Sequence, residues 1–479
     1  MNALEPYFVK HFGHEPTEGQ QKFFLALDRM LNSSMPRCTL LLTGYAGTGK
    51  TTSTKAVIDT FREIKQRAVL LAPTGRAAKI LGSYSGQQAF TIHKYIYQKK
   101  AMADGSAAFS MSVNKHKNTL FVVDEASMIG ESGVAAGGFQ YRSLLDDLIE
   151  FVFSGESCRL LLIGDNAQLP PVGIDQSPAL QLDKLKSDFY LTIAQIEFKE
   201  VLRQASDSGI LYNATLLRVQ QMENPEAYPV FELGGYNDIF RINGGDLQEY
   251  LEDEISSNGI EDVVVLTRSN KRANLFNEQI RRRILWQEEE INAGDHLMIV
   301  RNNYFWLDED EQQIAGFIAN GDTAEVHKII RTEDLWGFRF ADAMIELVDY
   351  DKIPPFEVKV ILDTLHSDGP SLDSDKSKAL YHYVAETYMH LGDKRLIHKA
   401  VMKDPYFNAL QVKFAYAITC HKAQGGQWPV VFVEQGYLTE DMLDLSYQRW
   451  LYTALTRAQQ KVYLVNFHPA FFGDEEEDF

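Results

Sequence analysis

Cysteine is scarce in this sequence of 479 residues. Its three cysteines, Cys38, Cys158 and Cys420, lie far apart along the chain. Three scattered thiols can form neither a disulfide framework nor a cysteine zinc site. Each lies in an apolar, strand-like stretch, so we expect buried free thiols and a protein of the reducing cytoplasm.

Long hydrophobic runs are also lacking. No stretch approaches the roughly 18 consecutive apolar residues of a membrane-spanning helix, which excludes that class of protein. The first residues include acids and lack a basic flank followed by an apolar run, so they resemble neither a signal peptide nor a transit peptide. No internal repeat is visible, which excludes solenoid folds.

Positive charge is in deficit, with 47 Lys+Arg against 66 Asp+Glu and a net charge of −19. This balance excludes a protein that coats nucleic acid with its whole surface, because phosphate binding needs Lys and Arg at the points of contact. The charge balance is still compatible with a basic groove on an otherwise acidic protein. Part of the imbalance lies in the acidic run 474–478, and we predict a solvated acidic tail over 468–479.

Short apolar runs alternate with helix-like or polar stretches through most of the chain. Continuous rather than alternating apolar residues indicate strands buried on both faces, as in parallel sheets. Because the runs form two series, we predict an α/β protein with two doubly wound parallel-sheet domains. The first series comprises Thr39–Leu42, Ala68–Leu71, Leu120–Val123 and Leu160–Ile163, and the second comprises Val263–Thr267, Phe414–Thr419, Val430–Val433 and Val462–Val465.

Residues 295–410 interrupt the second series with a different pattern. Short stretches separated by turn signals, among them Asn320-Gly321, predict antiparallel strands and therefore a small inserted β-barrel. A polar, helix-like stretch follows at 376–402. The predicted strands are Gly294–Val300, Ala324–Ile330, Gly337–Phe340, Met344–Val348 and Val358–Ile361.

The strongest functional signal is a complete G-x-x-x-x-G-K-T sequence, Gly44-Tyr45-Ala46-Gly47-Thr48-Gly49-Lys50-Thr51. It follows a predicted strand and precedes a helix-like stretch at 51–63, the context that this motif requires. Its backbone N–H groups, up to that of Thr52, would surround nucleotide phosphates, Lys50 would add a cation, and Thr51 would offer a hydroxyl to Mg²⁺. A chance glycine-rich turn explains this combination poorly, so we predict an NTP site.

Two further predicted strands end in polar residues. Asp124-Glu125 follows 120–123, where Asp124 can hold Mg²⁺ through water and Glu125 can polarise the attacking water. Gln168 lies in the loop after 160–163 and has an amide suited to sensing a terminal phosphate or water. Acids at a strand end and a Pro-terminated loop are also common surface features, but the P-loop favours the catalytic interpretation.

These three blocks resemble superfamily 1 helicases. The sequence Gly164-Asp165-Asn166-Ala167-Gln168-Leu169-Pro170-Pro171-Val172 resembles the RecD/Dda-type 1B branch, and the short N-terminus resembles its compact Dda-like members. Thr17–Gln20 resembles the Q motif of the family and is also a capping box for the next helix; both interpretations can hold. The other similar blocks are Ala72–Ala78 (motif Ia), Thr91–His93 (Ib), Glu200–Gln204 (IV), Ala417–Gly425 (V) and Leu451–Ala458 (VI).

The resemblance implies roles for particular residues. Gln20 would read adenine, Arg203 would meet the γ-phosphate, and Gly425 would lie at the nucleotide. Arg457 would be the arginine finger that stabilises charge on the transferring phosphoryl group. Single-stranded DNA would contact motifs Ia, Ib and V, at Pro73, Thr74, Arg76, Thr91, His93, Thr419 and His421. Thr267, Arg268 and Asn270 lie around another predicted strand end, and we expect them to line the same groove.

The same resemblance divides the chain into two RecA-like domains with insertions. Domain 1A would cover 1–190 and contain the 1B pin at 94–118, and domain 2A would cover 191–294 and 411–467. An SH3-like 2B barrel with a helical extension would occupy 295–410, and we interpret its helices as a packing insertion. In the pin, Phe109 is the candidate for stacking on a base at the fork; the alternative is that it packs on the first domain.

The sequence thus predicts an ATP- and Mg²⁺-dependent DNA helicase that moves on single-stranded DNA and unwinds forked or tailed duplexes. Membership of the branch implies 5′→3′ movement. A P-loop ATPase that acts as a conformational switch and a non-catalytic single-strand binding module are the alternatives. RNA stays open as a substrate. We expect a cytoplasmic, nucleoid-associated monomer without membrane contact, and a single-strand-binding protein is a candidate partner.

Overall fold

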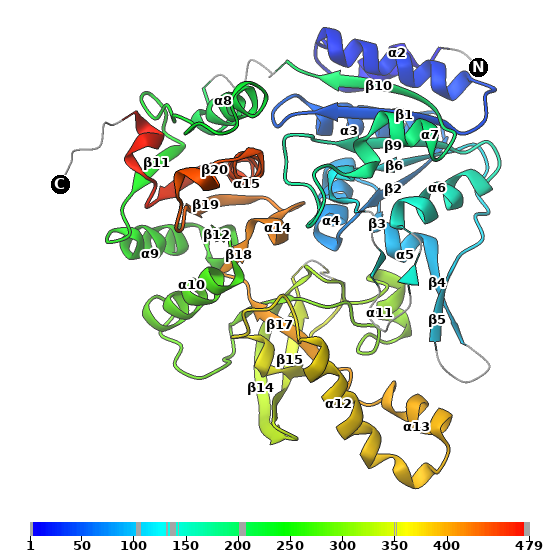
Figure 1. The fold of residues 1–479 in the computed structure, drawn as a ribbon. Helices are drawn as coiled ribbons and strands as arrows, with labels where there is room; N and C mark the ends of the chain where they lie inside the picture. Colours follow the sequence, from blue (N-terminus) through cyan, green and yellow to red (C-terminus); the bar gives the residue numbers. More distant parts are fainter. Residues whose placement is uncertain are drawn as a thin grey trace.

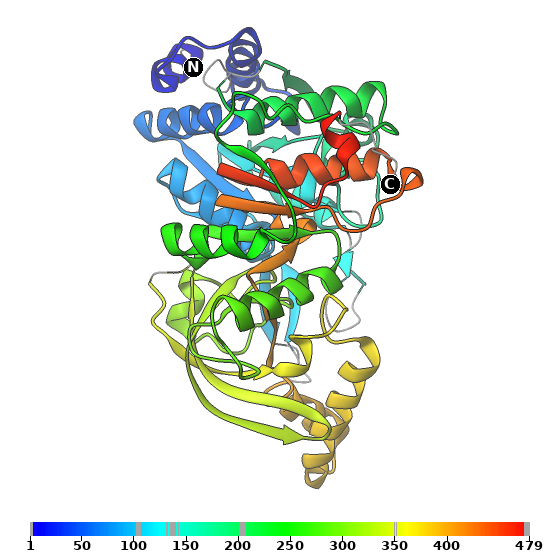
Figure 2. The same cartoon turned by 90° about the vertical axis from the view of Figure 1, so that its left-hand side faces the viewer.

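The structure is a computed structural model that describes residues 3–101, 107–130, 133–134, 140–141, 143–200, 207–348, 350 and 352–473. It contains two parallel sheets, a closed barrel below them, and a pair of helices that extends from the barrel (Figures 1 and 2). The predicted fold class, two doubly wound domains with an inserted barrel, is therefore confirmed. Within these residues, no helix is long and apolar enough to cross a membrane.

The first sheet has the strand order β10-β1-β9-β6-β2-β3, and all neighbours are parallel. Its central strands are buried on both faces because alternate residues enter different cores: in β1, Leu40 and Leu42 lie in one cluster and Leu41 in the other. The strands are β1 (Cys38–Gly44), β2 (Arg67–Ala72), β3 (Ala89–Thr91), β6 (Thr119–Val123), β9 (Arg159–Gly164) and β10 (Thr192–Phe198). The helices are α1 (Glu5–Phe12), α2 (Glu18–Asn32), α3 (Lys50–Glu63), α4 (Gly75–Ser85), α5 (Ile92–Ile96), α6 (Leu144–Ser154) and α7 (Leu182–Ser187).

Two short antiparallel pairs project from this domain. The longer pair, β4 (Tyr97–Ala101) and β5 (Ala107–Met111), follows α5 at the predicted position of the pin. The shorter pair is β7 (Gly133–Val134) with β8 (Gln140–Tyr141).

The second sheet has the order β11-β20-β19-β12-β18 and is also parallel throughout. Its strands are β11 (Ile239–Ile242), β12 (Val263–Thr267), β18 (Ala417–Thr419), β19 (Trp428–Glu434) and β20 (Ala458–Val465). The helices are α8 (Gly209–Glu223), α9 (Leu247–Asn258), α10 (Asn270–Arg283), α14 (Cys420–Ala423) and α15 (Leu445–Leu455). Helix α15 faces the first domain (Figure 1).

The inserted barrel closes through the order β13-β14-β15-β16-β17. Its strands are β13 (His296–Ile299), β14 (Thr323–Leu335), β15 (Phe338–Leu347), β16 (Phe356–Ile361) and β17 (Leu410–Phe414). Helix α11 (Glu309–Ile314) lies between β13 and β14, and α12 (Ser374–Thr387) and α13 (Lys394–Val401) lie between β16 and β17. The barrel contacts the first domain, since Lys94 donates a hydrogen bond to the Ile314 carbonyl and Lys79 donates to that of Val348.

Several predicted boundaries were wrong. Strand β10 pairs with β1, so the first sheet extends beyond residue 190. The predicted strand Phe414–Thr419 is divided between the barrel (β17) and the second sheet (β18), so the barrel extends past residue 410. The predicted strands at 337–340 and 344–348 form one strand, β15. The first two errors have one cause: a run of apolar residues indicates a strand but does not identify its neighbours in the sheet.

The cysteines and the C-terminal segment were also predicted from the sequence. The three cysteines are buried and free, as predicted. Phe471 is fully buried, so the beginning of the predicted tail packs on the second domain, while 474–479 lie outside the described residues.

Candidate active site and nucleic-acid interface

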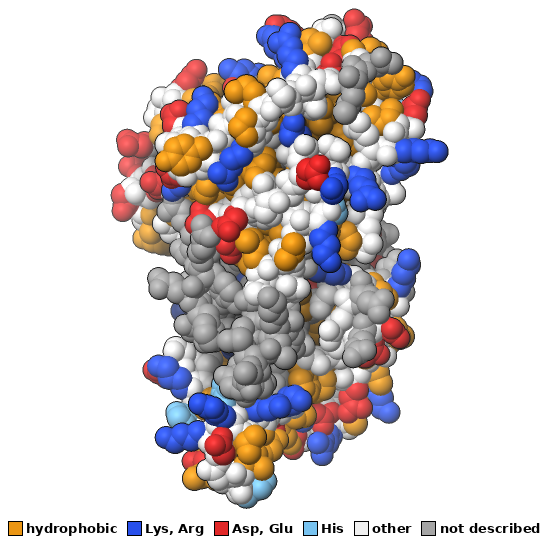
Figure 3. Space-filling model, turned by 90° about the vertical axis from the view of Figure 1, so that its right-hand side faces the viewer, with side chains coloured by type: hydrophobic (Ala, Val, Ile, Leu, Met, Phe, Trp, Pro, Cys, Tyr) orange, Lys and Arg blue, Asp and Glu red, His pale blue; other side chains and the backbone are white. Residues whose placement is uncertain are grey.

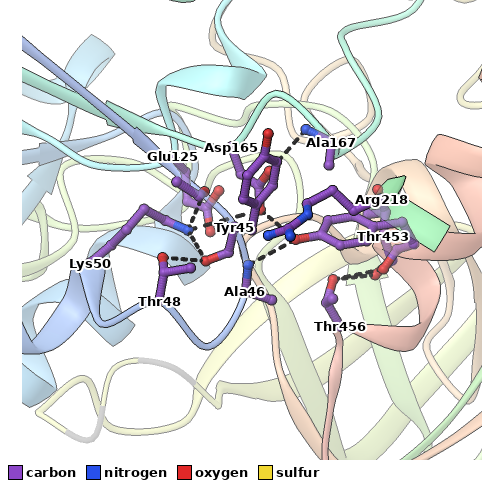
Figure 4. Close-up of polar contacts among 12 residues, drawn as sticks. Tyr45, Ala46, Thr48, Lys50, Glu125, Asp165, Ala167, Arg218, Thr453 and Thr456 are labelled. Atoms are coloured by element: carbon purple, nitrogen blue, oxygen red, sulfur yellow. Dashed lines mark hydrogen bonds and ion pairs between the residues drawn. The ribbon is translucent and has the colours of Figure 1, made fainter. Parts of the chain in front are cut away.

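The P-loop lies between β1 and α3, as predicted. Gly47 and Gly49 have φ values of 74° and 83°, a left-handed conformation that L side chains rarely adopt. The Lys50 ammonium donates to the carbonyl oxygens of Gly44 at 2.6 Å and Tyr45 at 2.9 Å (Figure 4). Thr51 and Thr52 are exposed at the first turn of α3. The loop therefore has the open helix N-terminus and the inward cation of a phosphate site.

Asp124 and Glu125 directly follow β6, whose carboxyl end lies at the same sheet edge as the P-loop. Asp124 accepts hydrogen bonds from the Tyr84 hydroxyl and the Glu125 N–H, both at 2.9 Å. Burial raises the pKa of both carboxyls, and the charge of Asp124 raises that of Glu125 further, against the opposing charges of Arg457 and Lys50. Glu125 has a φ of 53°, and such strained backbone clusters at functional sites.

The loop after β9 brings Asp165 and Gln168 to this edge. Asp165 lies 3.9 Å from Lys50 Nζ and accepts a hydrogen bond from the Ala167 N–H at 2.9 Å. Gln168 is 8% exposed, and its Oε1 has no hydrogen-bond partner among the described residues. A buried amide oxygen without a partner costs about 1–3 kcal/mol. Its position fits the predicted sensor of water or phosphate, which would supply a partner.

Arg457 follows α15 in the second domain and is only 3% exposed. Its guanidinium donates to the carbonyl oxygens of Thr453 at 3.1 Å and Gly426 at 3.2 Å, and to Thr456 Oγ1 at 3.3 Å. Its positive charge opposes the rise in the pKa of Glu125, so the guanidinium lies near this carboxyl of the other domain. The structure brings Lys50, the acid pair, Gln168 and Arg457 to one interface between the two domains.

Tyr452 joins the two sides of this interface, and sequence analysis missed it. Its hydroxyl accepts a hydrogen bond from the Ala46 N–H at 2.8 Å and donates to Asp165 Oδ2 at 2.8 Å. Burial, followed by the charge of Asp165, raises the pKa of Tyr452 far above its usual value, so this hydroxyl stays protonated. A tyrosine among leucines in an apolar helix is typical of core packing, and no sequence signal indicated this bridge.

The same helix makes a second bond across the interface. The Leu169 N–H donates to Thr453 Oγ1 at 2.8 Å, and Gln424 Nε2 donates to the Leu169 carbonyl at 2.6 Å. The loop that carries Gln168 is thus attached to both predicted motifs V and VI. Movement of α15 relative to the first domain must change these bonds.

Arg218 of α8 is another cation at the P-loop that sequence analysis missed. Its guanidinium carbon lies 4.2 Å from the centre of the Tyr45 ring (Figure 4), and Nη1 donates to the Lys199 carbonyl at 3.4 Å. The Tyr45 hydroxyl donates to Glu197 at 3.1 Å, and burial is the main cause that raises its pKa to about 12. A single arginine on a helix gives no sequence signal, because its role depends on the loop that it faces.

Gln20 connects α2 to the P-loop. The capping box is confirmed: Gln20 Oε1 accepts from the Thr17 N–H at 2.9 Å, and Thr17 Oγ1 accepts from the Gln20 N–H. Gln20 Nε2 donates to the Thr48 carbonyl at 3.1 Å. Its contact with adenine stays a prediction, and Arg203 lies outside the described residues.

The first-domain residues predicted to contact DNA follow β2 and β3. Pro73 precedes Thr74, which caps α4, and Thr91 caps α5. The Arg76 guanidinium lies 3.8 Å from the centre of the Trp428 ring and therefore contacts the second domain. His93 lies on α5, where burial lowers its pKa and favours the neutral ring.

The second-domain residues predicted to contact DNA are divided between two places. Thr419 and His421 lie at the start of α14, and a Cβ on the nearby Gly425 would lie 2.9 Å from the Ala77 side chain. This part of motif V therefore contacts α4, and the predicted nucleotide contact of Gly425 stays a prediction. Thr267 is fully buried and donates to the Ser269 carbonyl, so this structure offers its side chain to no ligand. Arg268 lies over the Tyr447 ring, and Asn270 begins α10.

The predicted pin is an antiparallel hairpin whose turn lies outside the described residues. The backbone places Phe109 in β5 opposite Lys99, within the strand and not in the turn. Tyr95 packs at its base, with its hydroxyl 2.8 Å from His116 Nε2. The Tyr97 hydroxyl donates to Asp147 at 2.7 Å. Both tyrosines therefore support the base of the hairpin, and the role of Phe109 stays a prediction.

Replacement of Tyr452 by phenylalanine tests the bridge between the domains. It leaves the Ala46 N–H and Asp165 each without one partner, so we expect a fall in stability of about 1–3 kcal/mol. We also expect DNA-stimulated ATPase to fall roughly tenfold, which corresponds to about 1.4 kcal/mol, with single-strand affinity unchanged. Thermal melting, ATPase and DNA-binding assays measure these effects.

Tyr447→Phe is the matched control, because Tyr447 is equally buried on α15 and bonds no first-domain residue in the described structure. Equal losses in the two variants would contradict a specific role for Tyr452.

Known families match both halves of the chain. The family described as AAA domain matches residues 18–229, and the UvrD-like helicase C-terminal domain matches residues 414–465. These segments contain the P-loop side and the Arg457 side of the site.

Individual proteins are similar to part or nearly all of this chain. The ATP-dependent RecD2 DNA helicase of Deinococcus radiodurans is 34% identical over 176 residues, 36% of this chain and 21% of that protein. The chain thus spans about a fifth of that relative. The ATP-dependent DNA helicase Dda of Enterobacteria phage T4 is 24% identical over 94% of this chain and 99% of its own length. A Pif1 helicase structure from Bacteroides in complex with ADP-AlF3 and single-stranded DNA aligns over 96% of this chain and 95% of that chain, at 14% identity and a TM-score of 0.47.

The ordered motifs, the two matched families and the relative that aligns along nearly the whole chain agree with one another. The chain is therefore similar to DNA helicases of the RecD/Dda type along nearly its whole length.

Proposed function

We propose that this protein is an ATP-dependent DNA helicase that moves on single-stranded DNA in the 5′→3′ direction and unwinds duplex DNA. The single observation that carries the proposal is the two-sided site. Lys50, the Asp124-Glu125 pair and Gln168 come from the first domain, and Arg457 comes from the second. A site built from two domains couples hydrolysis to their relative movement, which a simple binding module does not need.

Each residue has a role that its surroundings support. Lys50 would bind the β- and γ-phosphates, and Glu125 would accept a proton from the attacking water, since burial makes its carboxylate a better base. Arg457 would stabilise the charge that develops on the phosphoryl group. Tyr452 would transmit the state of the P-loop to α15, and with it to motif VI.

Mg²⁺ fits this site. No group of three or more metal-ligating side chains occurs among the described residues, and Mg²⁺ is usually held by one or two carboxylates together with substrate phosphates. Thr51 and Asp124 would hold the ion, which would neutralise phosphate charge.

One assay separates the proposal from its alternatives. ATPase is measured with and without single-stranded DNA, and unwinding is measured on duplexes with a 5′ or a 3′ tail. We expect DNA-stimulated ATPase and unwinding of the 5′-tailed duplex only. Hydrolysis without unwinding would favour the conformational switch, and DNA binding without hydrolysis would favour the binding module. Unwinding of only the 3′-tailed duplex would contradict the polarity.

Phe109→Ala tests the pin. On the proposed function, the variant loses unwinding strongly but keeps DNA-stimulated ATPase within a few-fold of wild type, because stacking on a base is worth about 1–3 kcal/mol. A buried Phe109 would instead cost roughly 3–5 kcal/mol of stability and lower both activities together. A melting curve beside the two assays decides, and equal loss of both activities would refute the pin role.

We further propose that the protein acts as a monomer on single-stranded and forked DNA in a reducing cytoplasm, which its free cysteines fit. Adding RNA in place of DNA to the ATPase assay tests whether it is also a substrate.

A further inference from the structure

Helices α12 and α13 form a hairpin that is firmly attached to the barrel. Leu380, Val384 and Val401 pack with Phe338 and Phe340 of β15 in one hydrophobic cluster. The Trp336 ring stacks on Tyr383, with centroids 6.2 Å apart and planes at 6°. The apolar contacts on the inner side of the hairpin thus stabilise it. The residues on its outer side make no contribution to this packing.

The outer side of α13 is basic in an otherwise acidic protein. Residues 394–403 contain four Lys or Arg and no Asp or Glu, whereas the whole chain has a net charge of −19. Lys394, Arg395, Lys399 and Lys403 are exposed, and none forms an ion pair with any residue that the structure describes. Uncompensated cations on an acidic protein indicate an anionic partner.

Three of these cations form a straight row, which we call the α13 ridge: Arg395, Lys399 and Lys403. They are spaced four residues apart, so they lie on one side of the helix about 6 Å apart along its axis. Helix α13 ends at Val401, and Lys403 lies in the turn that follows, where its N–H donates to the Ala400 carbonyl at 3.0 Å. The helix and its closing turn therefore present a row of cations about 12 Å long.

The ridge lies at the end of the molecule toward which the pin extends. In Figures 1 and 2, β4 and β5 run from the first domain toward the helical hairpin. Figure 3 shows Lys and Arg side chains gathered at this lower end. On the proposed role of the pin, duplex DNA approaches the protein from this end.

We propose that the α13 ridge binds the phosphate backbone of duplex DNA ahead of the fork. This inference rests on the proposed helicase function. Phosphates along one strand of B-DNA are about 3.4 Å apart along the axis, so the ridge can face roughly three of them. Contacts of this kind carry no sequence information, which suits an enzyme that must open any duplex. The exposed Leu396 beside the ridge would suit a protein partner. We favour DNA because the positive charges of the ridge have no acidic partners among the described residues.

The test compares two triple charge reversals of equal size. R395E/K399E/K403E removes the ridge, and R29E/K65E/K186E changes one exposed arginine and two exposed lysines on the first domain. Affinities are measured for a blunt duplex, a 5′-tailed duplex and the single strand alone, at several salt concentrations. Melting curves verify that both variants are folded, and single-strand-stimulated ATPase reports the active site.

For the ridge variant we expect the dissociation constants of both duplexes to rise about tenfold. The slope of log affinity against log salt on duplex should fall by about 2–3, at roughly 0.9 per lost phosphate contact. Single-strand affinity and ATPase should stay within twofold of wild type, and the control triple should change none of these.

Unchanged duplex affinity in the folded ridge variant would overturn the inference and direct attention to a protein partner. Equal losses in both triples would also overturn it, because the effect would then be general electrostatics. A wild-type protein without DNA-stimulated ATPase would contradict the helicase function. The blunt-duplex affinities of wild type and ridge variant would still test whether the α13 ridge binds duplex DNA.

Discussion

Replacement of Lys50 by alanine is expected to abolish ATP turnover, with a loss of at least about 10³-fold, or roughly 4 kcal/mol. In the structure, Lys50 is the cation held inside the P-loop by the Gly44 and Tyr45 carbonyl oxygens. Water cannot supply a fixed positive charge at the β- and γ-phosphates. Steady-state ATPase with saturating single-stranded DNA measures the loss.

Folding of the Lys50→Ala variant should be retained, because the P-loop contributes little apolar surface to the core. Lys55→Ala is the matched control: Lys55 lies on the same helix, is exposed and, among the described residues, pairs only with Asp59. Its ATPase should equal that of wild type. DNA-stimulated turnover in a folded Lys50→Ala variant would refute the assignment of the active site.

Replacement of Glu125 by glutamine is expected to preserve ATP binding while hydrolysis falls about 10²–10⁴-fold, the usual contribution of a general base. An amide of the same shape can keep the strained backbone at φ 53° but cannot accept the proton. A fluorescent ATP analogue measures binding, and a single-turnover assay measures hydrolysis. Glu156→Gln, a surface carboxylate paired with Lys117, is the control. Loss of nucleotide binding in the folded Glu125→Gln variant would indicate a structural role instead.

The pH dependence gives this prediction a second readout. Burial raises the pKa of Glu125, and catalysis needs its ionised form. Wild-type ATPase should therefore fall as the pH is lowered through this raised pKa. The small residual ATPase activity of the glutamine variant should not fall over this pH range, because the titrating carboxyl group is gone. An identical acid limb in both proteins would assign it to another residue.

Local sequence determined the parts of the site that depend on chain neighbours. An apolar strand that runs directly into a polar loop places the P-loop, Asp124 and Gln168 at strand ends, whatever the rest of the fold does. Parallel pairing of β1, β9 and β6 then brings these ends together at one edge, as the strand pattern predicted. The capping box at Thr17 and Gln20 was equally local and equally predictable.

Contacts between distant segments could not be predicted from the local sequence. Strand β10 belongs to the first sheet because it pairs with β1, and β17 belongs to the barrel because it pairs with β13 and β16. An apolar run has the same appearance in either sheet. Its neighbours are chosen by the packing of the whole chain.

The sequence by itself thus determined the resemblance to helicases, the two α/β domains and the residues that would act on a nucleotide, since each is written in contiguous motifs. Only the tertiary structure decided that Tyr452 bridges Ala46 and Asp165, that Arg218 covers Tyr45, and that Thr267 is buried. The physical reason is common to all three. Whether a tyrosine, an arginine or a threonine packs, binds or is withdrawn depends on the groups that the other domain or loop brings within about 3–5 Å, and that proximity is a property of the folded chain.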